Sequence, residues 1–163
     1  MPSSSVPPYP QPAFAFSVAV ASGSSSTAQA DAAFQEVSGI EAHVEVEEVP
    51  EGGVNSYVHQ LPGVTKHPNL VLKRGYVVQP SDLSQWAAQT VGSTLGTPIQ
   101  TQTLLVYLLD ATGQPLVTWT FYNAWPVKWT FSTLDAMNSS SVLTQTLEIS
   151  YTTVTTTQNQ GSG

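Results

Sequence analysis

Apolar and polar residues alternate with a period of two along most of the chain, which is the spacing of β-strands with one buried face. The alternation is clear in "FAFSVAVA" and "NLVLKRGYVV", and again near the C-terminus in "VLTQTLEISYTTV". Residues 33–63 predict two strands joined by a long hairpin, because "PEGG" at its centre favours a turn. Residues 104–109 are apolar throughout and predict a strand that is buried on both faces.

Three of the four tryptophans lie within "WTFYNAWPVKWTF", residues 119–131. The apolar side chains of this run keep one phase from Val117 to Phe131, while proline cannot donate to a ladder and so predicts a bulge or an edge near Asn123 to Pro126. Regular alternation favours a half-buried core strand over a surface that stacks sugars. The predicted core residues of this run are Trp119, Phe121, Trp125, Pro126 and Trp129.

Residues 81–91 predict the one helix of the chain. Ser81 is a plausible N-cap, and Leu83, Trp86 and Val91 recur at the spacing of a single helical face. Leu83 and Trp86 are therefore expected to join the core. Together these patterns predict a mainly β fold, an antiparallel two-sheet barrel or sandwich with one flanking α-helix.

The ends of the chain differ in composition from its middle. Residues 1–12 contain five prolines and predict an extended arm. Residues 155–163, "TTTQNQGSG", predict a flexible polar tail, which leaves 13–154 as the β domain. The N-terminal "MPSSSVPPYPQPAF" has no basic n-region and no long apolar h-region, so we expect assembly in the cytoplasm without a signal peptide and no insertion into a membrane by this chain.

Charge is scarce in this chain, and it is mostly negative. Only 9% of the residues are charged, the net charge is −7, and the basic side chains are Lys66, Lys73, Arg74 and Lys128. This balance excludes a surface for sequence-specific nucleic-acid binding. So few charges suit a surface that partner subunits largely cover. Cysteine is absent, which excludes disulfides and thiolate catalysis.

One row of side chains has candidate chemistry. Glu41, His43, Glu45 and Glu47 fall on one face of a predicted strand, where they could bind a hard cation or act as an acid and base pair. A solvated strand face is the simpler interpretation, because nothing else in the chain has metal-ligand spacing. We therefore expect no catalytic or metal site and no cofactor, and a structural protein rather than an enzyme.

Several segments in order, among them "FQEVSGIE", "NLVLKRG", "LLDATGQPLVTWTF", "NAWPVKW" and "TLEISY", resemble the tail tube proteins of contractile phage tails and of extracellular contractile injection systems. The similarity spans roughly residues 13–151. It implies a barrel-like subunit in homohexameric rings, which stack into a hollow tube inside a contractile sheath. The implied partners are further copies, the sheath, baseplate or hub and cap proteins, and a cargo or tape-measure protein in the lumen. The implied location is a phage-tail-like particle, released or attached to a cell.

The resemblance also implies that the hairpin tip joins successive rings. The sequence itself suggests a second set of contacts, because Lys73 and Arg74 are neighbours that point to opposite faces of a strand, and with four basic residues against eleven acidic ones at least one is expected to form an ion pair within or between subunits. The expected contact residues are Glu48, Glu51, Gly52, Gly53, Asn55, Tyr57, Lys73 and Arg74. The acidic row Glu41, Glu45 and Glu47 would line the lumen or a solvated face.

Three alternatives to a main tube subunit remain at this point. The first is a tube-initiating, baseplate-joining or cap-joining paralogue of the same fold. The second is a β-sandwich carbohydrate-binding module that uses surface tryptophans. The third is an enzyme acting through the row from Glu41 to Glu47.

Overall fold

The computed structural model describes residues 15–21, 31–49, 52–53, 59–76, 81–92, 96, 98–132 and 143–159. Within these residues the chain forms strands and one helix, in the following order: β1 (Ala15–Ala21), β2 (Asp31–Phe34), β3 (Glu36–Ser38), β4 (His43–Val49), β5 (His59–Lys66), β6 (Leu70–Gly75), α1 (Asp82–Val91), β7 (Gln102–Leu109), β8 (Pro115–Phe131), β9 (Thr144–Ser150) and β10 (Thr153–Gln158).

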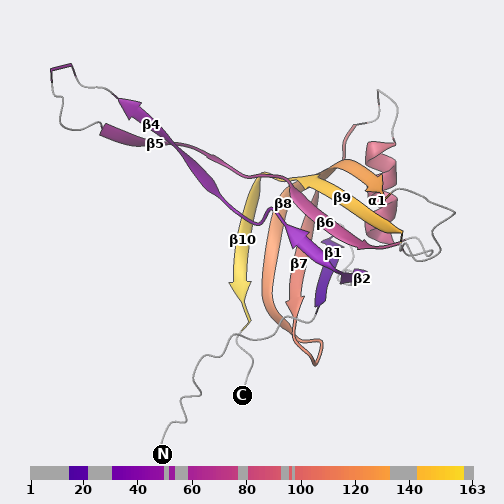
Figure 1. The fold of residues 1–163 in the computed structure, drawn as a ribbon. Helices are drawn as coiled ribbons and strands as arrows, with labels where there is room; N and C mark the ends of the chain where they lie inside the picture. Colours follow the sequence, from indigo (N-terminus) through magenta and orange to yellow (C-terminus); the bar gives the residue numbers. More distant parts are fainter. Residues whose placement is uncertain are drawn as a thin grey trace, which may run out of the picture.

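One long, bent sheet makes up the body of the molecule (Figure 1). Its strand order is β2-β1-β7-β8-β9-β6-β3, with β10 also paired to β8, and every pairing is antiparallel. The 17-residue strand β8 belongs to both halves, since its first part pairs with β7 and β10 and its last part with β9. We call β2, β1, β7, β10 and the first part of β8 the first layer, and the rest the second layer. The predicted fold class is confirmed.

The change of layer within β8 comes from two local irregularities. Asn123 has a positive φ of 51°, a left-handed conformation that asparagine tolerates better than most residues. The register to β9 then shifts between Pro126 and Lys128, as a β-bulge does. Burial consequently moves from Phe121 to Ala124 and Pro126.

The prediction of a single apolar phase through this run is therefore wrong, and Val127 and Phe131 are 39% and 43% exposed. The tryptophans of the run are each partly buried, and Trp119 and Trp129 pack against the core. A second expectation is also wrong. Leu104 and Val106 of β7 are fully buried, but Leu105 and Tyr107 on its other face are only partly covered.

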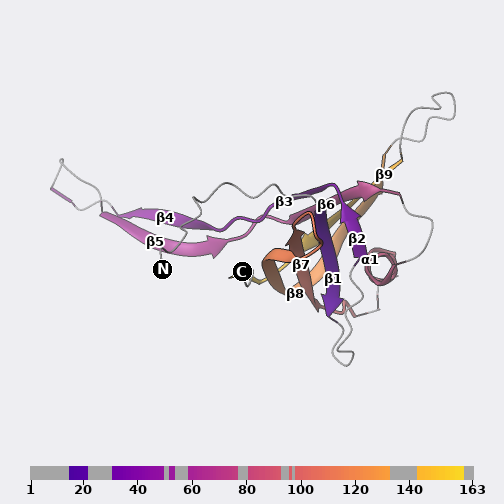
Figure 2. The same cartoon turned by 90° about the horizontal axis from the view of Figure 1, so that it is seen from below.

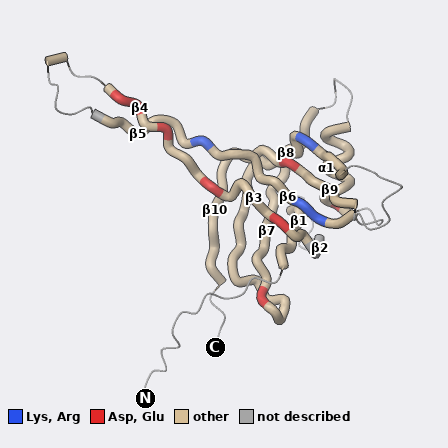
Figure 3. Tube along the Cα trace, in the orientation of Figure 1, with Lys and Arg blue, Asp and Glu red and all other residues tan. Residues whose placement is uncertain are grey.

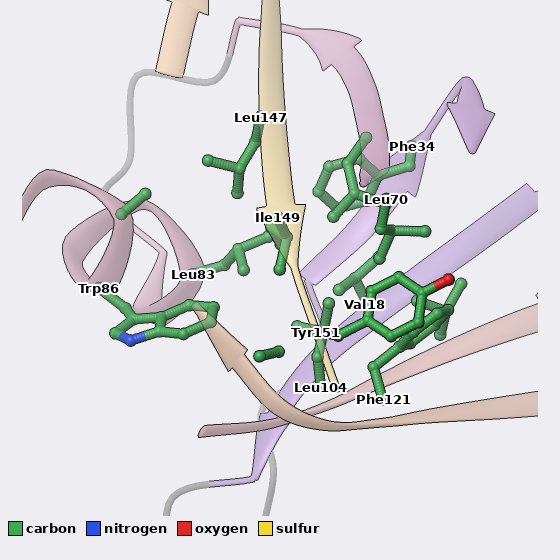
Figure 4. Close-up of a cluster of buried hydrophobic side chains, with 14 residues drawn as sticks. Val18, Phe34, Leu70, Leu83, Trp86, Leu104, Phe121, Leu147, Ile149 and Tyr151 are labelled. Carbon is green, nitrogen blue, oxygen red and sulfur yellow. The ribbon is translucent and has the colours of Figure 1, made fainter. Parts of the chain in front are cut away.

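The core lies between the two layers and is closed on one side by α1 (Figure 4). Val18, Leu104 and Phe121 come from the first layer, and Leu70 and Ile149 from the second. Burying each such side chain contributes roughly 1.5–3 kcal/mol. The edge of the Tyr151 ring packs against Phe121 at 4.8 Å between centroids, and its hydroxyl donates to the Gly39 carbonyl.

The predicted helix is confirmed, with Ser81 as its N-cap. The backbone N–H of Ser84 donates to Ser81 Oγ at 3.2 Å, which satisfies one of the free donors of the first turn. Leu83, Trp86 and Ala87 form its buried face. The indole N–H of Trp86 donates to the Gln100 carbonyl at 3.1 Å, so this buried ring has a polar partner as well.

The C-terminal boundary differs from the prediction. Thr155 to Gln158, expected in a flexible tail, belong to β10 and pair with Thr120 to Val117 of β8. Threonine is β-branched and suits a half-exposed strand. Val154 packs against the core, so the neighbouring Thr153 and Thr155 point outward. The predicted arm at residues 1–12 and the last four residues of the tail lie outside the described residues.

Candidate assembly surfaces

A second, two-stranded sheet formed by β4 and β5 projects from the body as an arm (Figure 2). Residues 41–49 are all exposed, and so are residues 60–66 apart from the half-buried Gly63. The exposed aliphatic side chains include Val44, Val46, Leu61 and Val64, with exposed fractions from 44% to 70%. An isolated two-stranded ribbon is marginally stable at best. The arm thus lacks the packing that stabilises the body.

Both faces of the arm mix apolar and polar side chains. Val44 lies opposite Thr65, Val46 opposite Pro62 and Glu48 opposite Gln60, so these side chains share one face. The register shifts at Glu45, where a Cβ on Gly63 would come within 3.0 Å of the Glu45 carbonyl. His43, Glu45, Glu47, Val49, Leu61 and Lys66 point the other way and form what we call the charged face, although Val49 and Leu61 are apolar.

Glu45 and Glu47 of the predicted acidic row lie on this charged face. The carboxylate of Glu45 forms an ion pair with the Lys66 ammonium, and Glu41 precedes β4. Within the described part of the chain, no group of three His, Asp or Glu side chains is placed to hold a metal ion. The solvated face is the interpretation that this geometry favours over an acid and base pair.

The tip of the arm is only partly described. Gly52 and Gly53 are exposed, and Gly53 has a φ of 101°, which glycine adopts without strain. Glu48 is exposed and lies opposite Gln60. The other predicted tip residues, Glu51, Asn55 and Tyr57, lie outside the described residues.

Lys73 and Arg74 point to opposite faces of β6, and they have different roles. The Lys73 ammonium is exposed and lies 3.7 Å from the Glu36 carboxylate on β3 of the same chain. The Glu148 carboxylate accepts a hydrogen bond from Asn69 Nδ2 at 2.7 Å. Such an exposed pair contributes under about 1 kcal/mol.

Arg74 is only 2% exposed, which corrects its assignment as a contact between subunits. Its Nη2 donates to Ser84 Oγ at 2.7 Å and to Ser81 Oγ at 3.2 Å, and its guanidinium lies over the Phe34 ring. The side chain thus fastens β6 to the first turn of α1. The pattern could have revealed this, since Arg74 stands in the inward phase between Leu72 and Tyr76.

Charged residues are unevenly distributed along the strands of the two layers (Figure 3). The second layer has Lys73 with Glu36, and Lys128 opposite Glu148. On β1, β7, β10 and the first part of β8, the described outward residues are uncharged and rich in hydroxyl groups. They include Thr103, Tyr107, Thr118, Thr120, Tyr122, Thr153, Thr155 and Thr157.

An exposed aromatic pair lies at the end of the second layer that is remote from the arm. Tyr76 and Phe131 are 48% and 43% exposed, and their rings meet edge to face at 5.8 Å between centroids. Strand β6 starts soon after the arm and runs away from it, and Arg74, Gln145 and Phe131 lie side by side on β6, β9 and β8. We call Tyr76 and Phe131 the aromatic end.

No described helix is long and apolar enough to cross a membrane.

The structural relatives of this chain include chains of an anti-feeding prophage, chains of an extracellular contractile injection system and Hcp proteins. A chain in the six-fold symmetrised baseplate of the anti-feeding prophage has a TM-score of 0.78 and 30% identity, covering 92% of this chain and 97% of that chain. A chain of the extended sheath-tube complex of an extracellular contractile injection system, PVC, has a TM-score of 0.74 and 23% identity, covering 93% and 94%. Hcp1 from Flavobacterium johnsoniae shares the fold, with a TM-score of 0.52 and 17% identity over 90% of this chain and 97% of its own.

No curated protein sequence matches the chain. Residues 12–155, however, match the family of the T4-like virus tail tube protein gp19. That match includes both layers, the helix and the arm, and only the last strand runs beyond it. The chain therefore belongs to the T4-like tail tube protein gp19 family.

Proposed function

We propose that the chain is a structural subunit of the inner tube of a contractile injection system or phage tail, in which copies form stacked rings. The observation that carries this proposal is the family match over residues 12–155. The fold shared with the prophage baseplate chain over 92% of this chain supports it. The function of such a subunit is mechanical: it forms a rigid conduit that a sheath drives forward.

The relatives also suggest the partners. Their structures are those of a baseplate, a sheath-tube complex and a tube-terminating cap. We propose that this chain contacts further copies of itself, sheath subunits, and baseplate and cap proteins, within an extracellular or prophage-derived particle. A hexameric ring is supported by the six-fold symmetry of the baseplate relative. A cargo or tape-measure protein would occupy the lumen.

The uncharged outer face of the first layer fits a role in assembly. Leu105, Tyr107 and Tyr122 are only partly covered within the chain, and no charge on these strands opposes contact with another subunit. Polar but uncharged surfaces of this kind are typical of surfaces that other subunits cover in an assembly. The arm is the proposed connector between rings, with the tip from Glu48 to Tyr57 as its leading part.

The carbohydrate-binding alternative is not favoured. It needs exposed tryptophan rings, but Trp86 is buried and Trp119, Trp125 and Trp129 are each partly buried. A tube-initiating paralogue is a second candidate, because the relative at 30% identity is found in a baseplate.

Electron microscopy of the purified chain tests these proposals. We expect rings about 10 nm wide or less with six-fold symmetry, since each subunit is a single small domain. Long tubes formed by this protein alone would identify a main tube subunit, whereas rings that lengthen only on a baseplate would identify an initiator. A protein that stays monomeric at high concentration, alone and with its baseplate partners, would contradict the proposed function.

A further inference from the structure

The arm continues a ladder that begins in the body. Strands β3 and β6 pair as far as Ser38 opposite Val71. Strands β4 and β5 then begin with His43 opposite Lys66. Both strands advance by the same number of residues between these two pairs, so the register of the ladder is unchanged. The arm leaves the body at this interruption, which we call the root of the arm and which consists of residues 39–42 and 67–69 (Figures 1 and 2).

Two residues of the root explain why the ladder is interrupted. Pro68 has no N–H to donate, and a continued register would place it opposite Glu41. Gly39 has a φ of 85°, and a Cβ at this position would collide with the Asn69 carbonyl. Contacts other than the ladder must therefore set the direction in which the arm leaves the body.

One side chain of the body contacts both strands of the root. Tyr151 directly follows β9 and is 9% exposed, and its ring packs edge-on against the fully buried Phe121 (Figure 4). Its hydroxyl donates to the Gly39 carbonyl at 3.2 Å, and its ring lies 5.3 Å from the His67 imidazole between centroids. The Nδ1 atom of His67 lies 3.4 Å from the Glu41 carbonyl oxygen. These contacts connect the core to the residues before β4 and after β5.

The Tyr151 hydroxyl remains a donor at neutral pH. Burial, and to a smaller extent the Glu41 carboxylate, raise the pKa of this hydroxyl above its usual value. The hydroxyl therefore keeps its proton, and its hydrogen bond to the Gly39 carbonyl is present under the conditions in which the protein assembles.

We propose that Tyr151 and His67 act as a latch that fixes the direction in which the arm leaves the body. Tyr151 is then a positioning residue of the arm as well as a core side chain. An arm that is held in one direction has lost part of its freedom before it meets a partner, so association costs less ordering. That consequence rests on the proposed function, whereas the direction of the arm is a property of the single subunit and is measured there.

The distance between two spin labels measures the direction of the arm. The chain contains no cysteine, so two introduced cysteines are labelled without interference. Gln60→Cys places one label on the arm and Thr155→Cys places the other on β10, and both positions are exposed. Labelled chains are diluted with unlabelled chains of the same variant, so that distances within one subunit are measured whatever its oligomeric state. Double electron–electron resonance then gives the mean distance and the width of its distribution.

Tyr151→Phe is the main test, because it keeps the ring against Phe121 and removes the hydroxyl. We expect it to raise the population of arms in other directions about fivefold, the factor that corresponds to about 1 kcal/mol for one hydrogen bond. His67→Ala removes the contact on the other strand and should widen the distribution in the same way. His43→Ala is the matched control, since His43 is an exposed histidine on β4. Thermal unfolding, followed by circular dichroism, should be nearly unchanged in all three variants.

Two glycine substitutions give an independent test. Gly39→Ala adds a Cβ that collides with the Asn69 carbonyl and should shift the mean distance. Gly75→Ala adds the same Cβ where no atom of the described residues lies within 4 Å beyond its chain neighbours, and should leave the mean unchanged. If Gly39→Ala does not fold, Tyr151→Phe still decides, because it adds no atom to the structure.

Three outcomes would overturn the inference. A wild-type distribution as wide as that of Tyr151→Phe would mean that the arm turns freely with the latch in place. An unchanged distribution in Tyr151→Phe or in His67→Ala would mean that the side chain does not hold the arm. Equal widening in His43→Ala would mean that the effect is not specific to the root. The tube function is tested separately, since wild-type protein that forms no rings in electron micrographs would contradict that function and leave the measured direction of the arm as it is.

Discussion

The body and the arm are built from the same kind of alternating strand, but they differ in where their apolar side chains find cover. In the body, Leu70 and Leu72 on β6 are fully buried between two layers. In the arm, Val44 and Val46 on β4 have the same spacing and stay exposed. The body therefore encloses its own core. The arm has the alternating pattern of a half-buried strand, but no second layer of the same chain covers its apolar side chains.

This difference separates stability from assembly within one short chain. Substitutions in the body should change the free energy of unfolding of the subunit. Substitutions on the arm should leave that free energy nearly unchanged and act on the association of subunits. The predictions below test this separation, and all unfolding measurements refer to concentrations at which the subunit is monomeric.

Phe121→Ala should have the largest effect on the body. Phe121 is fully buried and packs against Tyr151, so its removal opens a cavity between the layers. We expect a loss of about 3–5 kcal/mol in the free energy of unfolding, measured with urea. Tyr122→Ala is the control, because Tyr122 is the next residue, points outward and is substantially exposed. Similar losses from both variants would contradict the placement of the core.

Arg74→Ala should have the next largest effect. The substitution removes a buried side chain and leaves the hydroxyls of Ser81 and Ser84 without this donor. We therefore expect the free energy of unfolding to fall by about 2–4 kcal/mol. Hydrogen exchange should increase first in α1, whose N-terminal turn the guanidinium holds. Lys73→Ala, the neighbouring exposed cation, should stay within about 0.5 kcal/mol of wild type. A stable Arg74→Ala variant with unchanged exchange in α1 would show that the guanidinium is dispensable.

Much of the body was predictable from local patterns. The helix and its cap followed from Ser81 and the spacing of Leu83 and Trp86, and β9 followed from strict alternation up to Tyr151. These elements have no internal irregularity, so the sequence period and the structural period coincide. The hairpin was predicted from its turn residues rather than from a regular period, since its register shifts at Glu45, and Gly53 has the positive φ of a turn glycine.

The incorrect predictions have physical causes that the spacing of apolar residues along the sequence cannot reveal. The phase of β8 changes at Asn123 and again at the bulge beside Pro126, and each step moves the outward residues inward. Arg74 was expected to be a contact residue that could form an ion pair, yet hydroxyl partners at the start of α1 make its burial acceptable. Ser81 and Ser84 are near Arg74 in the sequence, but the alternation of apolar and polar residues gives no sign that they contact it.

The candidate contact residues were less predictable than the fold. Alternation cannot distinguish a strand that its own chain covers from one that a neighbour covers, so nothing in Val44 and Val46 indicated a free-standing arm.

A pair of identical substitutions should show a smaller but cleaner contrast between body and arm. Val106→Ala removes two methyl groups from a fully buried position and should lower the free energy of unfolding by about 1.5–3 kcal/mol. Val46→Ala makes the same change on the arm and should alter the free energy of unfolding by no more than about 0.5 kcal/mol. In assembled protein, Val46→Ala should lower the temperature at which tubes dissociate. An equal loss for both valines in the monomer would mean that the arm packs on its own body.

The smallest expected effect is a dependence on pH in the turn between β7 and β8. The Asp110 carboxylate accepts hydrogen bonds from the Thr112 hydroxyl and from the backbone N–H groups of Gln114 and Thr112, and these lower the pKa of Asp110 below its usual value. A group whose pKa is lower in the folded state stabilises that state above its unfolded pKa, about 3.9, and loses this contribution as the pH falls through the folded value. Asp110→Asn keeps an acceptor oxygen but does not titrate. We therefore expect the variant to lose slightly less stability than wild type between pH 5 and strongly acidic solution, as measured by thermal unfolding. If Asp110→Asn followed the wild-type curve, the turn would contribute nothing to the acid sensitivity of the body.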